Sequence, residues 1–427
     1  MVKELSERGA QARGRIRSLD EPEALRAWRE QAWERFEELP APRYERSDLS
    51  RRRVDAFAPE PPERAGDWEA LAAPFIGSGD EHPLLVFADG RLVLARSLDG
   101  LAGSGVRFMS LREAARVSPE LVKEHLGRAV PAGADKWLAL NAALWRDGAF
   151  VHAPKGADPG APLQIVCVTT GAGSGSFWRH LVIAEEGSRL AVLETYAAPA
   201  DLGDEFFVGV TEVSVGARAT VKAGAVSDLP RRATSVAVRR AVVAEGGDMR
   251  WVVGEMGDGY TVAEVGSHLA GEGSRSESSA IALGTGRSHL DLTARMIHSG
   301  RFSESGTSAR GVMQGRADAV YRGVTEIRKG AGGANGQQTE KLLMLSPQSR
   351  ADAIPMLLID ENDVKCGHAA SVGQIDENQM FYLMSRGVSE SAAKRMIVWG
   401  FIDPVLAELP ADAVRAAVER LLERKMA

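Results

Sequence analysis

A turn glycine followed by a short apolar strand recurs through the middle of this chain of 427 residues. The first three such glycines are Gly187, Gly216 and Gly247, and their spacing of about 30 residues is typical of stacked structural repeats. One repeat of this size cannot bury its apolar face alone, so neighbouring repeats must stack on one another. The pattern predicts a parallel β-helix. A β-sandwich or jelly roll stays open as the alternative, because glycine-bounded strands occur in every β architecture.

Three regions differ in the spacing of their apolar residues, and we interpret them as three domains. Residues 1–150 are mostly helical, because Leu25 and Trp28 begin a run of apolar side chains spaced three and four residues apart. Residues 151–375 alternate apolar with polar side chains over short runs, which is typical of strands. Residues 376–427 are helical again, and we expect them to cap the open end of the β-helix or to dock a partner.

The first region is not purely helical. Strand-like runs at 84–87 and 91–94 interrupt it. Ser118 is followed by Pro119, which suits the first position of a helix, so Ser118 is expected to cap that helix with its side chain. A further helix is predicted over 135–145.

Charge and cysteine content exclude several classes of protein. The formal net charge of −6 argues against a nucleic-acid binder, which would usually be basic. The first residues contain no apolar segment typical of a secretory signal, and no apolar stretch approaches the roughly 18 residues that span a bilayer. Two cysteines 199 positions apart, Cys167 and Cys366, do not form a disulfide framework. We therefore expect a cytoplasmic protein that binds neither nucleic acid nor membrane.

No signature of an enzyme was found in the sequence. It contains neither a phosphate-binding loop of the G-x-x-x-x-G-K-[ST] type nor a Gly-x-Ser-x-Gly elbow. Asp291, Asp318 and Asp352 recur near strands, and a β-helix polysaccharide-active enzyme of the secreted type would need such paired carboxylates. Turn chemistry explains these aspartates equally well, since they lie near the starts of repeats. The prediction is a protein that is not an enzyme.

Cys366 and His368 are the candidate metal ligands. In a strand they point to the same face, about 6.6 Å apart along the backbone. A thiolate beside an imidazole suits zinc or iron, and Gly367 between them leaves room for close approach. In the alternative interpretation both are core residues of a structural β-helix module without metal. An iron–sulfur cluster usually takes four protein ligands, so a second chain would have to complete this site.

Two C-terminal segments resemble the SufB/SufD family of iron–sulfur cluster assembly proteins. Residues 363–374, which contain Cys366 and His368, are similar to the end of the family's core domain. Residues 381–388 resemble its Phe-Tyr-Leu-x-x-Arg-Gly segment. Weaker likenesses occur near the N-terminus, so the resemblance covers essentially the whole chain. With only two cysteines, the chain looks like the SufD branch rather than the longer SufB branch.

The resemblance implies a mainly β fold, with a right-handed parallel β-helix core flanked by helical domains at both ends. It implies a non-catalytic subunit of a SufBCD-type complex that builds nascent clusters and transfers them. The partners would be a SufB-like paralogue, or a second copy of the chain, at the core and a SufC-type ABC ATPase at the C-terminal helices. Partner contacts are expected at Phe381, Tyr382, Arg386 and Gly387.

The resemblance also assigns the metal chemistry. His368 and Cys366 would bind iron or a nascent cluster at the subunit interface, transiently, with no cofactor held stably by the chain alone. A neutral imidazole can ligate iron at cytosolic pH, whereas the thiol must lose its proton, which a bound metal favours. ATP hydrolysis would be carried out by the partner.

Overall fold

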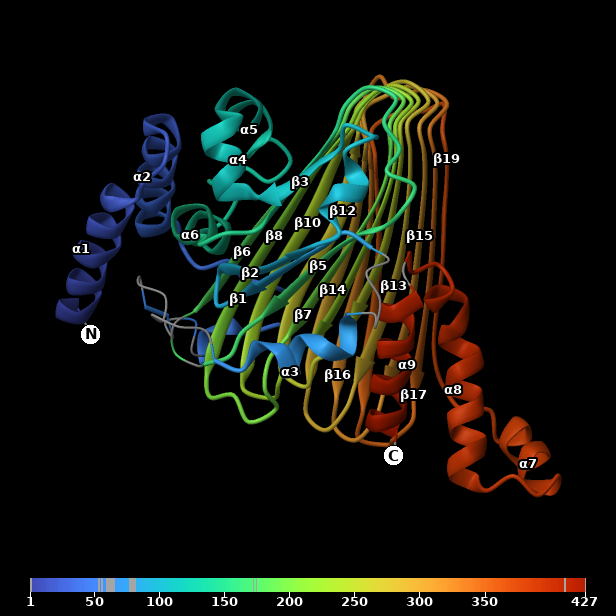
Figure 1. Ribbon diagram of the computed structural model, residues 1–427. Helices are drawn as coiled ribbons and strands as arrows, with labels where there is room; N and C mark the ends of the chain where they lie inside the picture. Colours follow the sequence, from blue (N-terminus) through green and yellow to red (C-terminus); the bar gives the residue numbers. More distant parts are fainter. Residues whose placement is uncertain are drawn as a thin grey trace.

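The computed structural model describes residues 2–52, 54, 57–58, 66–76, 82–171, 173, 175–410 and 412–426. The chain is mainly β, and its body is a β-solenoid of about eight turns with helices at both ends of the chain. Each turn contributes one strand to each of two sheets (Figure 1). All contacts between successive turns are parallel, which confirms the predicted β-helix and excludes the sandwich and the jelly roll.

The two sheets alternate along the sequence. The ten-stranded sheet contains β1 (Leu84–Ala88), β2 (Arg91–Arg96), β5 (Leu163–Val168), β7 (Arg189–Ala197), β9 (Thr220–Asp228), β11 (Asp248–Glu255), β13 (Arg275–Gly284), β15 (Glu304–Met313), β17 (Asn335–Met344) and β19 (Lys365–Gln374). The nine-stranded sheet contains β3 (Arg107–Ser110), β4 (Ala149–Ala153), β6 (Ser176–Ala184), β8 (Glu205–Val215), β10 (Ala233–Val243), β12 (Tyr260–Leu269), β14 (His289–His298), β16 (Asp318–Ile327) and β18 (Arg350–Ile359).

Glycines at the corners allow the turns to stack. Gly315 has a φ of 72°, and a Cβ at this position would lie 3.1 Å from the backbone oxygen of Gly286, the equivalent glycine of the previous turn. Only glycine adopts this backbone conformation without strain. The recurring turn glycine of the sequence is therefore a requirement of the corner.

A buried ion network crosses the space between the sheets. Arg239 on β10 contacts Glu194 on β7 and Glu255 on β11, each at 3.3 Å, and all three side chains are almost fully buried. Removing one partner of such a group leaves an unpaired buried charge, at a cost of about 3–5 kcal/mol. The network thus fixes how the two sheets face each other in the middle turns.

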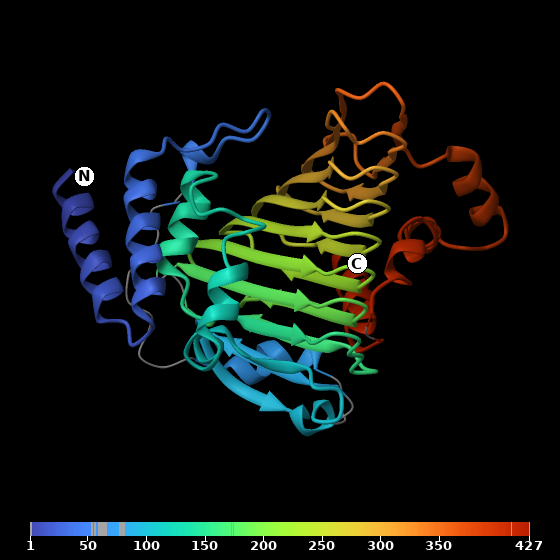
Figure 2. The ribbon, with the colours of Figure 1, turned by 90° about the horizontal axis from the view of Figure 1, so that it is seen from above.

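The N-terminal helices cover the outer face of the nine-stranded sheet (Figures 1 and 2). They are α1 (Val2–Ser18), α2 (Glu23–Glu38), α4 (Leu111–Val117), α5 (Pro119–His125) and α6 (Lys136–Leu144). Leu25 and Trp33 of α2 join the same apolar cluster as Phe150, Phe206 and Val208 of the sheet. The helical periodicity of the sequence therefore located α2 correctly.

In the first region one prediction is wrong and another is confirmed. Ser118 does precede α5, but its side chain makes no capping hydrogen bond; instead it accepts one from Arg107 at 2.6 Å. The strand-like runs form β1 and β2, which extend the ten-stranded sheet beside β5. Part of the predicted N-terminal region therefore belongs to the sheets.

The C-terminal helices lie along a side of the solenoid. They are α7 (Glu377–Ser385), α8 (Glu390–Leu406) and α9 (Asp412–Met426), and α3 (Trp68–Ala72) lies near them; short 3₁₀ helices occur at Leu49–Arg51, Ala73–Phe75 and Leu98–Leu101. Val398 and Ile402 of α8 and Val418 of α9 pack on the outer face of the ten-stranded sheet. Of the two expected roles, capping of the open end is wrong, because the apolar faces of α8 and α9 are buried against this side.

None of the helices in the described part of the chain is both long and apolar enough to cross a bilayer.

Candidate functional site

The last turn of the solenoid is left uncovered. Among the described residues, β18 pairs only with β16, and β19 pairs only with β17, so each strand has one free edge of ten residues. In Figure 2 no helix lies beyond this turn, which is at the upper end of the view. Leu358, Ile359 and Val372 are 50%, 42% and 42% exposed there. A free edge of this length is a template for pairing with another chain.

Cys366 lies on β19 and points into the solenoid. It packs beside Ile327, Ala331 and Ala334 and is half-buried. Its register partner on β17 is Gly336, and a Cβ at Gly336 would lie 3.5 Å from the Cys366 sulfur. The missing side chain of Gly336 therefore leaves space under the thiol.

Burial raises the pKa of the Cys366 thiol, and the backbone amide of Gly367 opposes this only in part. The thiol is therefore mainly protonated near neutral pH. A bound metal ion would shift it to the thiolate, since the thiolate is the form that ligates metals.

His368 lies on the same face of β19, two residues further along, opposite Gln338 of β17. Its side chain is exposed, and it has no hydrogen bond or ion pair within the described part of the chain. Both residues lie on one strand, two positions apart, so their side chains share one face of β19. Exposure leaves the imidazole available to a ligand or to a second chain.

The ligand set of this end is incomplete. No group of three or more His, Cys, Asp or Glu side chains lies close enough to hold a metal ion in the part of the chain that the structure describes. Cys167 does not contribute, because β5 is seven strands from β19, about 33 Å at the usual strand spacing. Its sulfur instead lies 3.8 Å from His180 in the buried interior.

The predicted partner-binding residues are on α7 and the turn that follows it. Phe381 and Tyr382 are 74% and 58% exposed, and no residue of α7 is buried. The Arg386 guanidinium lies 5.3 Å from the centre of the Tyr382 ring. Gly387, with a φ of 86°, ends the helix in a conformation that favours glycine. Helix α7 projects from the body of the molecule (Figure 1).

A groove of about 450 Å³ separates α7 and α8 from the corner between β17 and β18. We call it the methionine groove. It is lined by Met344, Leu345, Ser346, Pro347, Gln374, Ile375, Glu377, Met380, Phe381, Met384, Glu390 and Lys394. Flexible methionine side chains are common on surfaces that bind other proteins. Sequence reasoning missed this groove, because its two walls are brought together only by the fold.

Two family models and several known proteins match most of this chain. Residues 167–401 match the family model described as "SUF system FeS cluster assembly, SufBD core domain", and residues 86–165 match the SufBD protein N-terminal region. The chain is 34% identical over 415 residues to the iron–sulfur cluster assembly protein SufD of Bacillus subtilis, covering 95% of both chains. A SufBD family protein of Staphylococcus haemolyticus is 32% identical over 326 residues, which is 76% of this chain and 70% of that protein.

Proposed function

The chain belongs to the SufBD family of iron–sulfur cluster assembly proteins, and from this premise we propose that it is a SufD-like, non-catalytic subunit of a larger complex. The observation that carries the proposal is the uncovered last turn, where two free strand edges flank Cys366 and His368. A chain that worked alone would gain nothing from leaving ten-residue edges unpaired, since such edges promote aggregation. A partner that covers these edges would explain why the strands are unpaired and why Cys366 and His368 lie beside them.

The partner at this end is a SufB-like paralogue or a second copy of the chain. Its own strands would continue the two sheets through backbone hydrogen bonds to β18 and β19. The contact would also cover the exposed apolar side chains Leu358, Ile359 and Val372. The interiors of the two solenoids would then meet at the turn that carries Cys366 and His368.

Cys366 and His368 supply two ligands to the iron or nascent cluster that the complex handles as its cargo. A cluster usually takes four protein ligands, so the opposite subunit provides the others. Two ligands from one chain bind a cluster weakly. This suits a site that has to release its cluster to another protein.

Helix α7 and the methionine groove form the binding surface for a SufC-type ABC ATPase. The exposed aromatic pair Phe381 and Tyr382 is of the kind that dominates binding energy at protein interfaces. Helix α8 packs against β13 and β15, and Arg310 of β15 donates a hydrogen bond to the backbone oxygen of Phe401. Movement of α7 and α8 by the ATPase would reach strands close to β19 and change access to Cys366 and His368.

The polysaccharide-enzyme alternative gains no support from its three aspartates. Asp291 accepts a hydrogen bond from Ser47, Asp318 contacts His289 at 3.1 Å, and Asp352 pairs with Arg46 at 3.1 Å. Asp291 and Asp352 therefore hold the segment around residue 47 against the nine-stranded sheet, and Asp318 contacts it only through His289, which lies 2.8 Å from the Ser47 hydroxyl.

Co-expression of the tagged chain with the neighbouring genes, followed by anaerobic purification, tests the proposal. We expect recovery of an ABC-type ATPase and a related solenoid chain, with iron and sulfide in the complex. Recovery of the chain alone, monomeric and free of metal, would instead favour a structural β-helix module.

A further inference from the structure

A group of buried oxygen atoms without hydrogen-bond partners lies one turn inside the open end. Tyr321 on β16 and Gln338 and Glu340 on β17 are 3%, 2% and 1% exposed. The Tyr321 hydroxyl, the Gln338 Oε1 and both carboxylate oxygens of Glu340 make no hydrogen bond within the described part of the chain. Buried polar atoms almost always have a partner, so four such atoms in one place indicate a missing ligand.

These oxygens face one small space beside Gly323 of β16. A Cβ on Gly323 would lie 2.5 Å from Glu340 Oε1 and 2.8 Å from Gln338 Oε1. Any residue other than glycine would therefore intrude on both oxygens. Tyr321, two residues before Gly323 on the same face, is close enough for Glu340 to raise the pKa of its phenol, after burial itself.

The space contains acceptors but no positive charge. Two buried carboxylates of the middle turns differ from Glu340, because Glu194 and Glu255 both pair with Arg239 between the sheets. Glu340 has no ion pair within the described residues, and the Gly323 backbone amide only partly offsets the effect of burial on its pKa. A buried carboxylate needs a compensating cation or hydrogen bonds. The described residues provide no cation for Glu340, and the Gly323 amide compensates its burial only in part.

The site lies close to the open end. Only the last turn separates it from solvent, and the residues directly above Glu340 and Gly323 in that turn are Ala370 and Pro355. His368 lies directly above Gln338. Both small residues and the imidazole are exposed or only partly covered. The three side chains thus lie one strand below the exposed last turn.

We propose that Glu340, Gln338 and Tyr321 form an oxygen-ligand site for a divalent cation, which holds ferrous iron one turn inside the Cys366–His368 site. Its role in supplying iron to Cys366 and His368 rests on the function proposed above. Carboxylate and amide oxygens suit Mn²⁺, and at a given site Fe²⁺ binds more tightly than Mn²⁺, whereas the thiol and imidazole of the outer turn suit the later, sulfur-rich cluster. Water completes the coordination, since three protein oxygens are too few.

Binding of Mn²⁺ to the purified full chain tests the site directly. Mn²⁺ prefers oxygen ligands, and a site that binds it binds Fe²⁺ at least as tightly. Free Mn²⁺ is followed by electron paramagnetic resonance at pH 8, with an excess of Mg²⁺ as competitor. We expect one Mn²⁺ per chain, binding at least tenfold weaker in Glu340→Gln, and the same loss in Gly323→Ala, which fills the space but keeps the carboxylate.

Two controls separate this site from others. Glu277→Gln removes an exposed carboxylate from β13 and should leave Mn²⁺ binding unchanged. Cys366→Ser combined with His368→Ala should retain Mn²⁺ binding within about threefold, because the inner oxygens remain. If thermal unfolding shows that Glu340→Gln does not fold, Mn²⁺ binding by Gly323→Ala tests the site instead.

The inference is overturned if the wild-type chain binds no Mn²⁺, or if Glu340→Gln and Gly323→Ala bind it as the wild type does. It is also overturned if the Cys366 and His368 substitutions abolish binding while Glu340→Gln does not. These outcomes do not bear on recovery of the complex. A chain that assembles with its partners yet binds no Mn²⁺ at Glu340 would keep the proposed function and lose this site.

Discussion

At the scale of single residues, position in the solenoid decides what a side chain can do. Cys167 and Cys366 both point inward from strands of the same sheet. Cys167 is fully buried beside His180, and burial raises its pKa well above the usual value. Cys366 is on the last strand and keeps a route to solvent. The two cysteines differ in burial because Cys366 lies in the last turn of the solenoid and Cys167 does not.

The exposed imidazole of His368 leads to the first prediction. His368→Ala should fold normally, with a change in unfolding free energy within about 0.5 kcal/mol, because surface substitutions seldom cost more. Within the purified complex the same variant should lose most of its iron and sulfide. Ser371→Ala, an exposed change on the same strand, is the matched control. Equal iron content in both variants would show that His368 does not bind the iron.

His298 leads to a prediction on pH. Burial lowers the pKa of His298 to about 4, and its two ring nitrogens contact Ser303 and Ser305 at 2.9 and 2.8 Å. The unfolded chain takes up this proton near pH 6.5, while the folded chain resists it until about pH 4. Stability should therefore be unaffected above pH 7 and should fall by about 3 kcal/mol as the pH drops from 6.5 to 4.

Urea unfolding of the wild type and of His298→Asn between pH 4 and pH 8 measures this effect. The variant should show the shallower loss below pH 6.5, since asparagine does not titrate. Parallel curves for the two proteins over the whole range would show that His298 does not titrate as described.

The sequence singled out Cys366 and His368 but not Glu340. Alternation along a strand was enough to place Cys366 and His368 on one face. Glu340 could not be identified, because its lack of a partner depends on Gly323 and Tyr321, which belong to the opposite sheet. Whether a buried side chain has a hydrogen-bond partner depends on the whole fold. The face to which a side chain points depends only on its position in the strand.

At the scale of elements, α7 differs from every other long helix because it buries none of its residues. Helices in water are stabilised mainly by packing of an apolar face. A helix with exposed aromatic side chains and no packed face therefore indicates a missing contact. Helices α8 and α9, by contrast, are held by buried side chains and by the Lys425–Asp258 contact at 2.6 Å.

Substituting both aromatic residues of α7 tests this interpretation. Phe381→Ala with Tyr382→Ala should weaken binding of the ATPase at least tenfold, because exposed aromatic anchors often contribute about 2 kcal/mol or more each. Thermal stability should stay unchanged, since neither ring is packed. Binding is measured with the purified ATPase by calorimetry.

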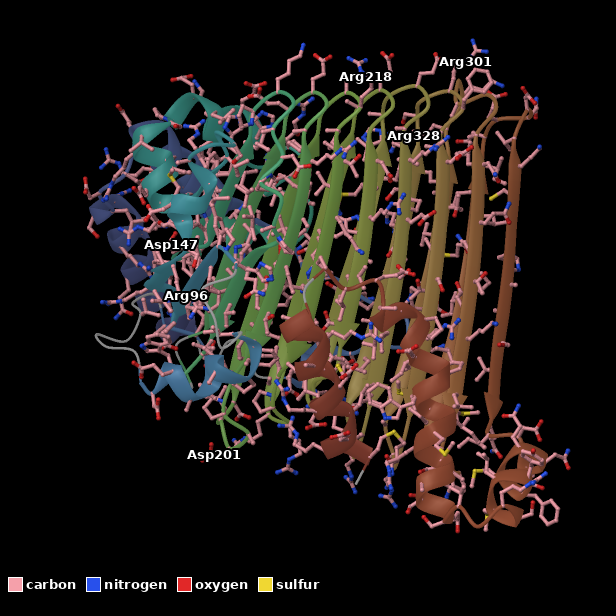
Figure 3. All side chains as sticks on the ribbon, turned by 45° about the vertical axis from the view of Figure 1, so that its right-hand side comes forward. Arg96, Asp147, Asp201, Arg218, Arg301 and Arg328 are labelled. Carbon is pink, nitrogen blue, oxygen red and sulfur yellow. The ribbon has the colours of Figure 1, made fainter. Side chains whose placement is uncertain are left out.

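Phe302→Ala provides the matched control. Phe302 is 52% exposed and follows Arg301, which is labelled at the corner opposite α7 in Figure 3. This variant should bind the ATPase as the wild type does. If the α7 variant also binds normally, the ATPase docks elsewhere.

Element positions were predictable where periodicity was strong. The helix from Glu23 and the strand at 163–168 follow directly from apolar spacing. The place of the C-terminal helices was not predictable. Their apolar faces, which include Val418 and Leu421, indicate burial but do not say against which surface.

At the scale of the whole molecule, the solenoid is closed at one end and open at the other. The first turns are covered by helices and by the antiparallel strands β2 and β3. The last turn has neither, and its side chains are largely exposed. Stacked repeats normally need a polar cap at each end. The asymmetry is explained if the partner chain is the missing cap.

Hydrogen exchange of the backbone amides is the measurement that tests this claim most directly. Exchange in β18 (Arg350–Ile359) and β19 (Lys365–Gln374) is compared between the isolated chain and the purified complex. We predict fast exchange at the free-edge amides of both strands in the isolated chain and strong protection in the complex. Unchanged exchange in both strands, with protection appearing on the outer faces of the sheets instead, would contradict the account.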